Sequence, residues 1–250
     1  MDLVIEIGSL ILIGFIAGGI NTMAGGGSLL TLPILIFLGL PPNIANGTNR
    51  IAILFQNIFT TAGFKSKGII TFPFSIYLGI SALIGSIIGA QIAIDIKGDT
   101  FNKILAIIMV VIVIYMVFKP KTTAGSIIEK TSGKRLWLSV ILFFFVGIYG
   151  GFIQAGVGFI ILLVLSSVNN LSLVKSNAVK VTVVLIYTIA SVGVFIYNDK
   201  INWEMGLTLA IGNSIGGWVA SRWSVSKGDG LVRKFLIVMV VIMAIKLWFF

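Results

Sequence analysis

Residues 21–28 read Asn-Thr-Met-Ala-Gly-Gly-Gly-Ser, and a related stretch at residues 154–158 reads Gln-Ala-Gly-Val-Gly. Each stretch is polar and rich in glycine, and each interrupts an otherwise apolar region of the chain. A short apolar segment follows each break, at 27–39 and at 156–168. These two breaks divide two long apolar regions at matching places, which indicates that the chain has two related halves.

The composition of the chain is that of a membrane protein. Of its 250 residues, 58% are hydrophobic and 10% are charged, whereas a soluble domain has about 25% charged residues. Apolar stretches of about 18 residues or more recur from end to end. We therefore predict an all-α polytopic protein in a lipid bilayer. The predicted segments are 4–20, 27–39, 44–64, 71–94, 102–118, 136–152, 156–168, 174–197, 204–221 and 232–250.

The second five segments repeat the first five. Matches at glycine and charged positions are more specific than apolar matches, and several occur in register. They pair Gly14 with Gly147, Gly25-Gly26-Gly27 with Gly156-Val157-Gly158, Arg50 with Lys180, Gly63 with Gly193, Gly85 with Gly212, and Lys97-Gly98-Asp99 with Lys227-Gly228-Asp229. We predict an N-terminal repeat at 1–118, a linker at 119–135 and a C-terminal repeat at 136–250.

Loop charges predict the orientation of these repeats. With ten alternating segments, most loop lysines and arginines fall on the side of the linker, and little beyond Lys97, Lys103 and Lys200 falls on the other. The positive-inside rule then places the linker in the cytoplasm and the N-terminus outside. Five segments per half make the repeats inverted. A rival count treats 4–39 and 136–168 as one broken crossing each, which gives eight crossings and parallel halves but splits the positive loops. If the first two segments of each half form a re-entrant hairpin instead of two full crossings, the inverted topology of the ten-segment count is unchanged.

The two breaks have the properties of a ligand site within the membrane. A helix over 27–39 or 156–168 spans only about 20 Å at 1.5 Å per residue, less than the hydrocarbon core of about 30 Å. Irregular backbone at that depth must be buried in protein or line a cavity. Paired broken helices in two halves mark transporter sites. Each helix start offers free N–H groups and the positive end of its dipole, which glycine lets an anion approach.

Two cations occupy matching positions, each at the start of an apolar helical run. They are Arg50 and Lys180, and polar residues precede both. A charge within a membrane helix is costly and usually marks a ligand path or a partner. Together with the breaks, these cations predict a site for a small anion. The candidate residues are Asn21, Thr22, Gly25, Gly26, Gly27, Asn49, Arg50, Gln154, Gly156, Gly158, Asn177 and Lys180.

Simpler interpretations exist for the same residues. Glycine clusters often serve only close helix packing. Arg50 and Lys180 could each extend to the lipid headgroups from the first turns of their helices. Gln56 and Asn57 are as consistent with bonds between helices as with ligand contacts.

Several classes of protein are excluded or disfavoured. The chain has no cysteine and no histidine, so thiolate and imidazole metal sites are excluded. No carboxylate falls in the middle of a predicted segment, which disfavours cation transport and a carboxylate proton relay. No Walker A motif is present. The net charge of +10 lies mainly in loops and does not indicate nucleic-acid binding. We therefore predict no enzyme activity and no cofactor, while a homo-oligomer stays open.

The motifs also carry a family resemblance. Residues 14–28, followed by Leu32-Pro33, Gly39-Leu40-Pro41-Pro42 and Ala45-Asn46-Gly47-Thr48-Asn49-Arg50, resemble the sulfite exporter TauE/SafE family. Residues 150–159 are similar to the second-half signature of that family, with Val157 interrupting the glycines. The resemblance implies an inner-membrane permease for small sulfur-containing or organic anions, with a substrate and a direction that vary among members.

The leading hypothesis is a secondary anion transporter that works by alternating access between inverted halves. The anion would rest between the two breaks. Sulfite and sulfonates fit this site, and so do small carboxylates. A passive anion channel is the alternative, with the glycine breaks as its filter. A scaffold that transports nothing is a third reading.

Overall fold

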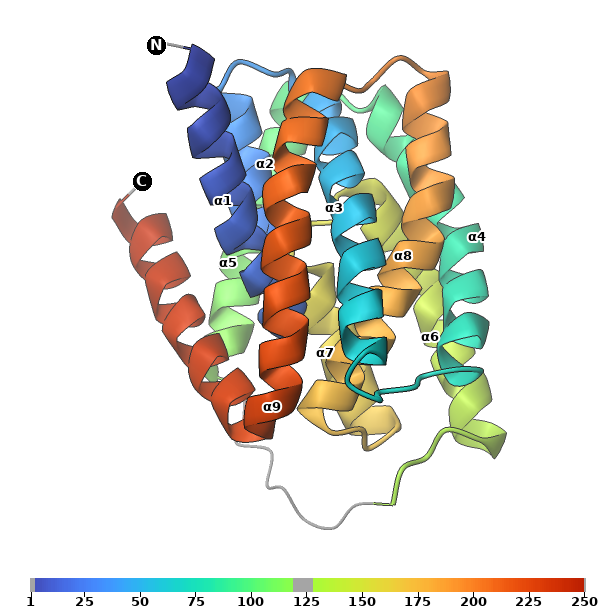
Figure 1. Cartoon of the computed structure of the whole chain (residues 1–250). Helices are drawn as coiled ribbons and strands as arrows, with labels where there is room; N and C mark the ends of the chain where they lie inside the picture. Colours follow the sequence, from blue (N-terminus) through green and yellow to red (C-terminus); the bar gives the residue numbers. More distant parts are fainter. Residues whose placement is uncertain (1–2, 119–127, 250) are drawn as a thin grey trace.

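The chain folds into a bundle of helices (Figure 1). The structure is a computed structural model that describes residues 3–118 and 128–249. Those residues form nine helices and no strand, which confirms the all-α prediction. The helices are α1 (Leu3–Ala24), α2 (Ser28–Phe37), α3 (Pro42–Lys65), α4 (Phe74–Asp95), α5 (Gly98–Phe118), α6 (Gly133–Phe152), α7 (Val157–Val168), α8 (Leu173–Tyr197) and α9 (Trp203–Phe249).

The observed helices follow the predicted segments closely as far as α8. The predicted segments 204–221 and 232–250 both lie within α9, which is continuous over Trp203–Phe249, so the break expected between them is helical. Figure 1 shows that α9 bends sharply at its lower end, so its two arms take the places of the two predicted segments. The predicted linker at 119–135 lies partly outside the described residues, at 119–127.

The lengths of the helices agree with a membrane protein. Within the described residues, four helical stretches are long and apolar enough to cross a membrane. They are Ile7–Ala24, Phe74–Asp95, Gly133–Phe152 and Leu173–Tyr197. The helices that follow the glycine breaks are shorter, with 10 residues in α2 and 12 in α7. At 1.5 Å per residue they extend only about 15 and 18 Å, too little for a full crossing of about 30 Å.

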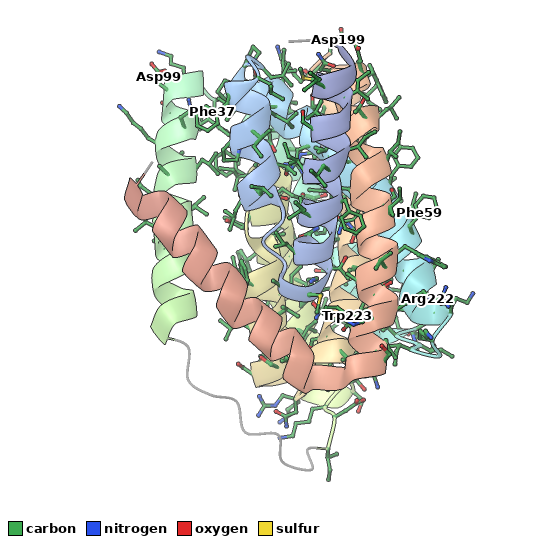
Figure 2. The ribbon with its side chains drawn as sticks, turned by 60° about the vertical axis from the view of Figure 1, so that its left-hand side comes forward. Phe37, Phe59, Asp99, Asp199, Arg222 and Trp223 are labelled. Carbon is green, nitrogen blue, oxygen red and sulfur yellow. The ribbon has the colours of Figure 1, made fainter. Side chains whose placement is uncertain are left out.

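The chain runs in opposite directions in the two predicted halves. In Figure 1, α1 and α3 descend from the upper end, whereas α6 and α8 rise from the lower end. Helix α2 turns back toward the upper end, and α7 turns back toward the lower end. Figure 2 accordingly places Phe37, at the end of α2, near the same end as Asp99 and Asp199. The breaks therefore form two hairpins that enter the bundle from opposite ends.

Polar side chains gather inside the bundle and apolar ones cover its outside. Helix α3 buries Asn46, Asn49, Arg50, Gln56 and Asn57 among its neighbours. Helix α4 has a face of exposed isoleucines four residues apart, at positions 80, 84, 88 and 92, which are about half exposed. Exposed apolar faces of this extent are unfavourable in water and natural in lipid. This distribution explains how a polar site can exist inside so hydrophobic a chain.

Two glycine-lined crossings join the predicted halves. A Cβ atom on Gly14 or Gly212 would overlap the backbone of the facing helix, where α1 crosses α9. The same holds for Gly147 and Gly85, where α6 crosses α4. Glycines four residues further on repeat each contact: Gly18 and Gly216 in the first crossing, and Gly151 and Gly89 in the second. Small residues at this spacing let membrane helices approach closely, and both crossings join a helix before the linker to one after it.

Candidate functional site

The two glycine breaks touch each other. A Cβ atom on Gly25 would overlap the backbone of Gly158, and a Cβ atom on Gly158 would overlap the backbone of Gly25. Gly25 has a φ of +85° and Gly156 a φ of +69°, which only glycine adopts without strain. Gln154 also takes a positive φ, of 60°. The glycines at these breaks thus serve both the turn and the close approach of two hairpins.

The short helices begin at this contact with little capping. Gly27 precedes α2 and Gly156 precedes α7, and neither start has a side-chain cap. Within the described residues, the N–H groups of Gly26, Gly27 and Ser28 donate to no acceptor. All three residues are buried. Unpaired N–H groups at a helix start, with the positive end of the dipole behind them, favour an anion.

Arg50 lies fully buried against the end of α6. Its Nη1 donates to the carbonyl of Gly150 at 3.0 Å, and its Nη2 donates to the carbonyl of Gly151 at 2.5 Å. The side chains of Gln154 and Ser191 accept from Nη1 at 3.2 and 3.1 Å. These carbonyls belong to the last turn of α6, where the helix dipole is negative and a cation is stabilised. Arg50 therefore caps the helix that leads into the second break.

Two further groups shape the surroundings of Arg50. Its guanidinium lies 4.7 Å from the ring centre of Phe195, a distance suited to a cation–π contact. Asn46 accepts from Nη2 at 3.3 Å and donates to the carbonyl of Phe152 at 2.8 Å, which ties α3 to the same helix end. The Nε of Arg50 finds no hydrogen-bond partner among the described residues. One donor of Arg50 therefore remains free.

Lys180 plays the matching role at the end of α1. Its Nζ donates to the carbonyls of Asn21 and Thr22 at 2.7 and 2.9 Å, and to Oδ1 of Asn177 at 2.6 Å. The amide of Asn177 donates to the carbonyl of Met23 at 3.1 Å. An ammonium has three donors, so Lys180 is fully satisfied here. The last turn of α1, which leads into the first break, is capped from α8.

The two cations therefore cap in a crossed manner. Arg50, from the predicted N-terminal repeat, binds the broken helix of the C-terminal repeat, and Lys180 binds the broken helix of the N-terminal repeat. Each break then holds a cation on its carbonyl side and a helix start on its N–H side. Both cations are buried inside the bundle, Arg50 at 0% and Lys180 at 2% exposure, so neither reaches toward headgroups. The headgroup interpretation fails in this structure.

The other polar candidates have hydrogen-bond partners of their own. The amide of Asn21 donates to Gln56 at 3.1 Å, and the hydroxyl of Thr22 donates to the carbonyl of Gly18 at 2.8 Å. It is the backbone carbonyls of both residues that meet Lys180. Oδ1 of Asn49 accepts from the hydroxyl of Thr31 at 2.6 Å. The Nδ2 of Asn49 has no partner in the described part of the chain.

Several residues of the site were not among the predicted candidates. Ser191 and Phe195 reach Arg50 from the next turns of α8, while Gly150 and Gly151 offer it only backbone oxygens. The hydroxyl of the buried Tyr187 lies beside Gly150. Tyr187, Ser191 and Phe195 are spaced four residues apart on α8. That spacing identifies them as neighbours of Arg50 only once α8 is known to pack beside α3 and α6. Gln56 bonds to α1, as expected for a residue that links helices.

The chain matches one protein family over nearly its whole length. Residues 10–247 match the sulfite exporter TauE/SafE family. A relative from Sinorhizobium sp., named "probable membrane transporter protein ORF9", is 26% identical over 93% of this chain and 88% of its own. A Haemophilus influenzae relative named "probable membrane transporter protein" is 27% identical over 99% and 96%, and YfcA of Escherichia coli K12 is 27% identical over 96% and 89%. No solved structure matches.

The relatives are named as membrane transporters, and the apolar helices of this chain suit that assignment. The breaks and Arg50, which carry the resemblance in the sequence, lie together in the fold, with Lys180 beside the first break. This chain therefore belongs to the sulfite exporter TauE/SafE family of membrane transport proteins.

Proposed function

We propose that the protein is a secondary transporter that carries a small anion between the two glycine breaks. The observation that carries this proposal is the contact between Gly25 and Gly158, where two helix starts point at one centre. The free N–H groups of Gly26, Gly27 and Ser28 would replace part of the hydration shell of the anion.

The charges around this centre favour an anion over a cation. Arg50 and Lys180 are both buried, and no buried carboxylate offsets them among the side chains that the structure describes. A buried positive charge in a low-dielectric interior attracts an anion much more strongly than it would in water. Arg50 has a donor to spare at Nε, whereas Lys180 has none. The anion would therefore accept a hydrogen bond from Arg50, whereas Lys180 would attract it electrostatically without a hydrogen bond.

Alternating access would follow from a relation between the halves. We propose that 1–118 and 136–250 are inverted repeats, joined by the linker 119–135. The opposite directions of corresponding helices (Figure 1) and the equivalent crossings of α1 with α9 and α6 with α4 support this relation. Because the hairpins enter from opposite ends, withdrawing one would open the centre to one side only. The loop charges favour a cytoplasmic linker and an external N-terminus.

The chemistry of the site favours oxyanions with several acceptors. Sulfite and sulfonates present three oxygens that N–H groups and Arg50 can share, and the family name points to sulfite. A small carboxylate presents two. Uptake of labelled sulfite, thiosulfate, sulfoacetate and acetate into proteoliposomes would separate these classes. We expect saturable uptake of at least one sulfur oxyanion.

A passive channel is the competing function, and counterflow distinguishes the two. When the vesicles contain unlabelled anion, a carrier takes up labelled anion faster. The reason is that its binding site moves back to the outer side with an anion bound rather than empty. We expect such trans-stimulation here. Conductance that grows linearly with anion concentration, without trans-stimulation, would instead establish a channel, and the absence of flux for every anion would favour a scaffold.

A further inference from the structure

A long groove lies on the outer face of the bundle, between α3 and α9. Its volume is about 910 Å³. One wall is a stripe of residues along α3 and the other is a stripe along α9, and each stripe follows the three- to four-residue repeat of a helix. The lining residues are Phe55, Ile58, Phe59 and Ala62 of α3, and Leu207, Ala210, Ile211, Ser214, Ile215 and Trp218 of α9. All but Ser214 are apolar, so the groove suits a hydrocarbon chain.

One end of the groove is cationic. The stripe on α3 continues from Ala62 to Lys65, and the stripe on α9 continues from Trp218 to Arg222. Both cations are exposed. The guanidinium of Arg222 lies 5.3 Å from the ring centre of Trp218, which lines the groove. Figure 2 shows Phe59 and Arg222 on the same side of the molecule, with Arg222 below.

The two cations stand at neighbouring helix ends. A Cβ atom on Gly63 would collide with the side chain of Ser221, so the last turn of α3 contacts α9 there. Lys65 and Arg222 lie two residues and one residue beyond that contact. At the opposite end of the α9 stripe stands the exposed carboxylate of Glu204. The charge of the groove is therefore polarised along its length.

The dimensions of the groove match one leaflet of a bilayer. Its α9 wall runs from Leu207 to Trp218, which is about 17 Å at 1.5 Å per residue. Half of a hydrocarbon core of about 30 Å is about 15 Å. A chain that fills this groove would thus come from a single leaflet, with its headgroup at Lys65 and Arg222.

We propose that this groove binds one anionic phospholipid, with an acyl chain between α3 and α9 and its phosphate on Lys65 and Arg222. Cations at the end of an apolar groove between membrane helices suit such a headgroup. A second copy of the chain is a poorer occupant. A two-fold axis along the membrane normal would bring the same cationic ends of both copies together. The site is separate from the glycine breaks and does not depend on the proposed transport.

Native mass spectrometry of the detergent-solubilised protein tests this site. The probes are phosphatidylglycerol and phosphatidylcholine with identical acyl chains, titrated against wild type and Lys65→Gln plus Arg222→Gln. We expect one phosphatidylglycerol to bind in preference to phosphatidylcholine, and the double variant to bind it roughly tenfold more weakly. Ala62→Phe fills the groove and keeps both cations, so we expect it to weaken both lipids.

A matched control removes two other exposed cations near the same end of the molecule. Lys134→Gln plus Arg135→Gln changes the charge equally at the start of α6, away from the groove. We expect it to retain the bound phosphatidylglycerol. If both double variants lost phosphatidylglycerol binding equally, the effect would come from the overall positive charge of the protein and not from this groove, which would overturn the proposal. Unchanged retention in the groove variants would overturn it as well, as would a dimer that forms through this face without lipid.

Discussion

At the scale of single residues, the site rests on cations that bind backbone. Arg50 and Lys180 donate to the last carbonyls of α6 and α1, and without them the broken helices would leave buried acceptors such as the carbonyls of Gly151 and Thr22 unpaired. An unsatisfied buried polar group costs about 1–3 kcal/mol. Each cation thus stabilises the break of the other predicted half while adding positive charge beside it.

Replacement of Lys180 by methionine should loosen the first hairpin. The carbonyl of Thr22 would lose its donor, at a cost of about 1–3 kcal/mol, and the carbonyl of Asn21 would keep only the N–H of Gly25. The chain has no cysteine, so a single cysteine at Ser28 can report on the break through thiol labelling. We expect labelling to be faster in Lys180→Met with Ser28→Cys than in Ser28→Cys alone. Equal rates would contradict the capping role of Lys180.

The contact between Gly25 and Gly158 should tolerate no side chain. A methyl group at either position would collide with facing backbone, and Gly25 would also be strained by its positive φ. We expect Gly25→Ala and Gly158→Ala each to destabilise the protein by about 1–3 kcal/mol and to lower its melting temperature. Gly193→Ala is the control, because a Cβ atom there meets nothing within 4 Å. A control as damaging as the site variants would refute the close approach.

The residue scale also marks the limit of what the sequence predicts. Arg50, Lys180 and the break glycines stand out in the sequence because charge and glycine are unusual in apolar helices. Asn21 and Thr22 were predicted as candidates for their side chains, and Gly150 and Gly151 belong to the family motif. All four meet the cations through backbone oxygens instead. Every residue has a backbone carbonyl, so the sequence does not indicate which carbonyls accept from Arg50 and Lys180. Only the fold reveals that each cation caps a helix of the other half.

At the scale of helices, glycine decides which elements cross. The α1–α9 and α4–α6 crossings each use glycines four residues apart on both partners. Helix ends were well predicted where polar or glycine-rich stretches interrupt apolar ones. Within α9 the sequence did not predict that Lys227-Gly228-Asp229-Gly230, which has the composition of a loop, would have a helical backbone. Glycine costs a helix about 1 kcal/mol relative to alanine, and this cost does not end α9, although Figure 1 shows that α9 bends sharply at its lower end.

Bulky substitutions should separate the crossings. In Gly85→Val and Gly212→Val, the added atoms would overlap backbone of α6 and α1, so we expect lower melting temperatures and less monodisperse protein in detergent. Gly8→Val serves as the control because a Cβ atom there has no neighbour within 4 Å. If all three variants behave alike, the glycines do not determine helix approach.

At the scale of the whole molecule, the two hairpins enter the bundle from opposite ends, and the loop charges predict which of these ends faces the cytoplasm. Figure 2 places Phe37, Asp99 and Asp199 near one end and Arg222 toward the other. In intact cells, we expect a membrane-impermeant thiol reagent to label Asp199→Cys and Phe37→Cys. Arg222→Cys should react only after permeabilisation, because the positive-inside rule places that end in the cytoplasm. The reverse pattern would contradict the predicted topology.

We propose that an anion rests between the two breaks, beside the buried cations Arg50 and Lys180. The most direct test is saturable uptake of the transported sulfur oxyanion into proteoliposomes by Arg50→Gln plus Lys180→Gln. The exposed pair Lys134→Gln plus Arg135→Gln is the charge-matched control. We predict that uptake is lost in the first variant and retained in the second, with equal amounts of folded protein inserted. Normal uptake by the Arg50 and Lys180 variant would contradict the account.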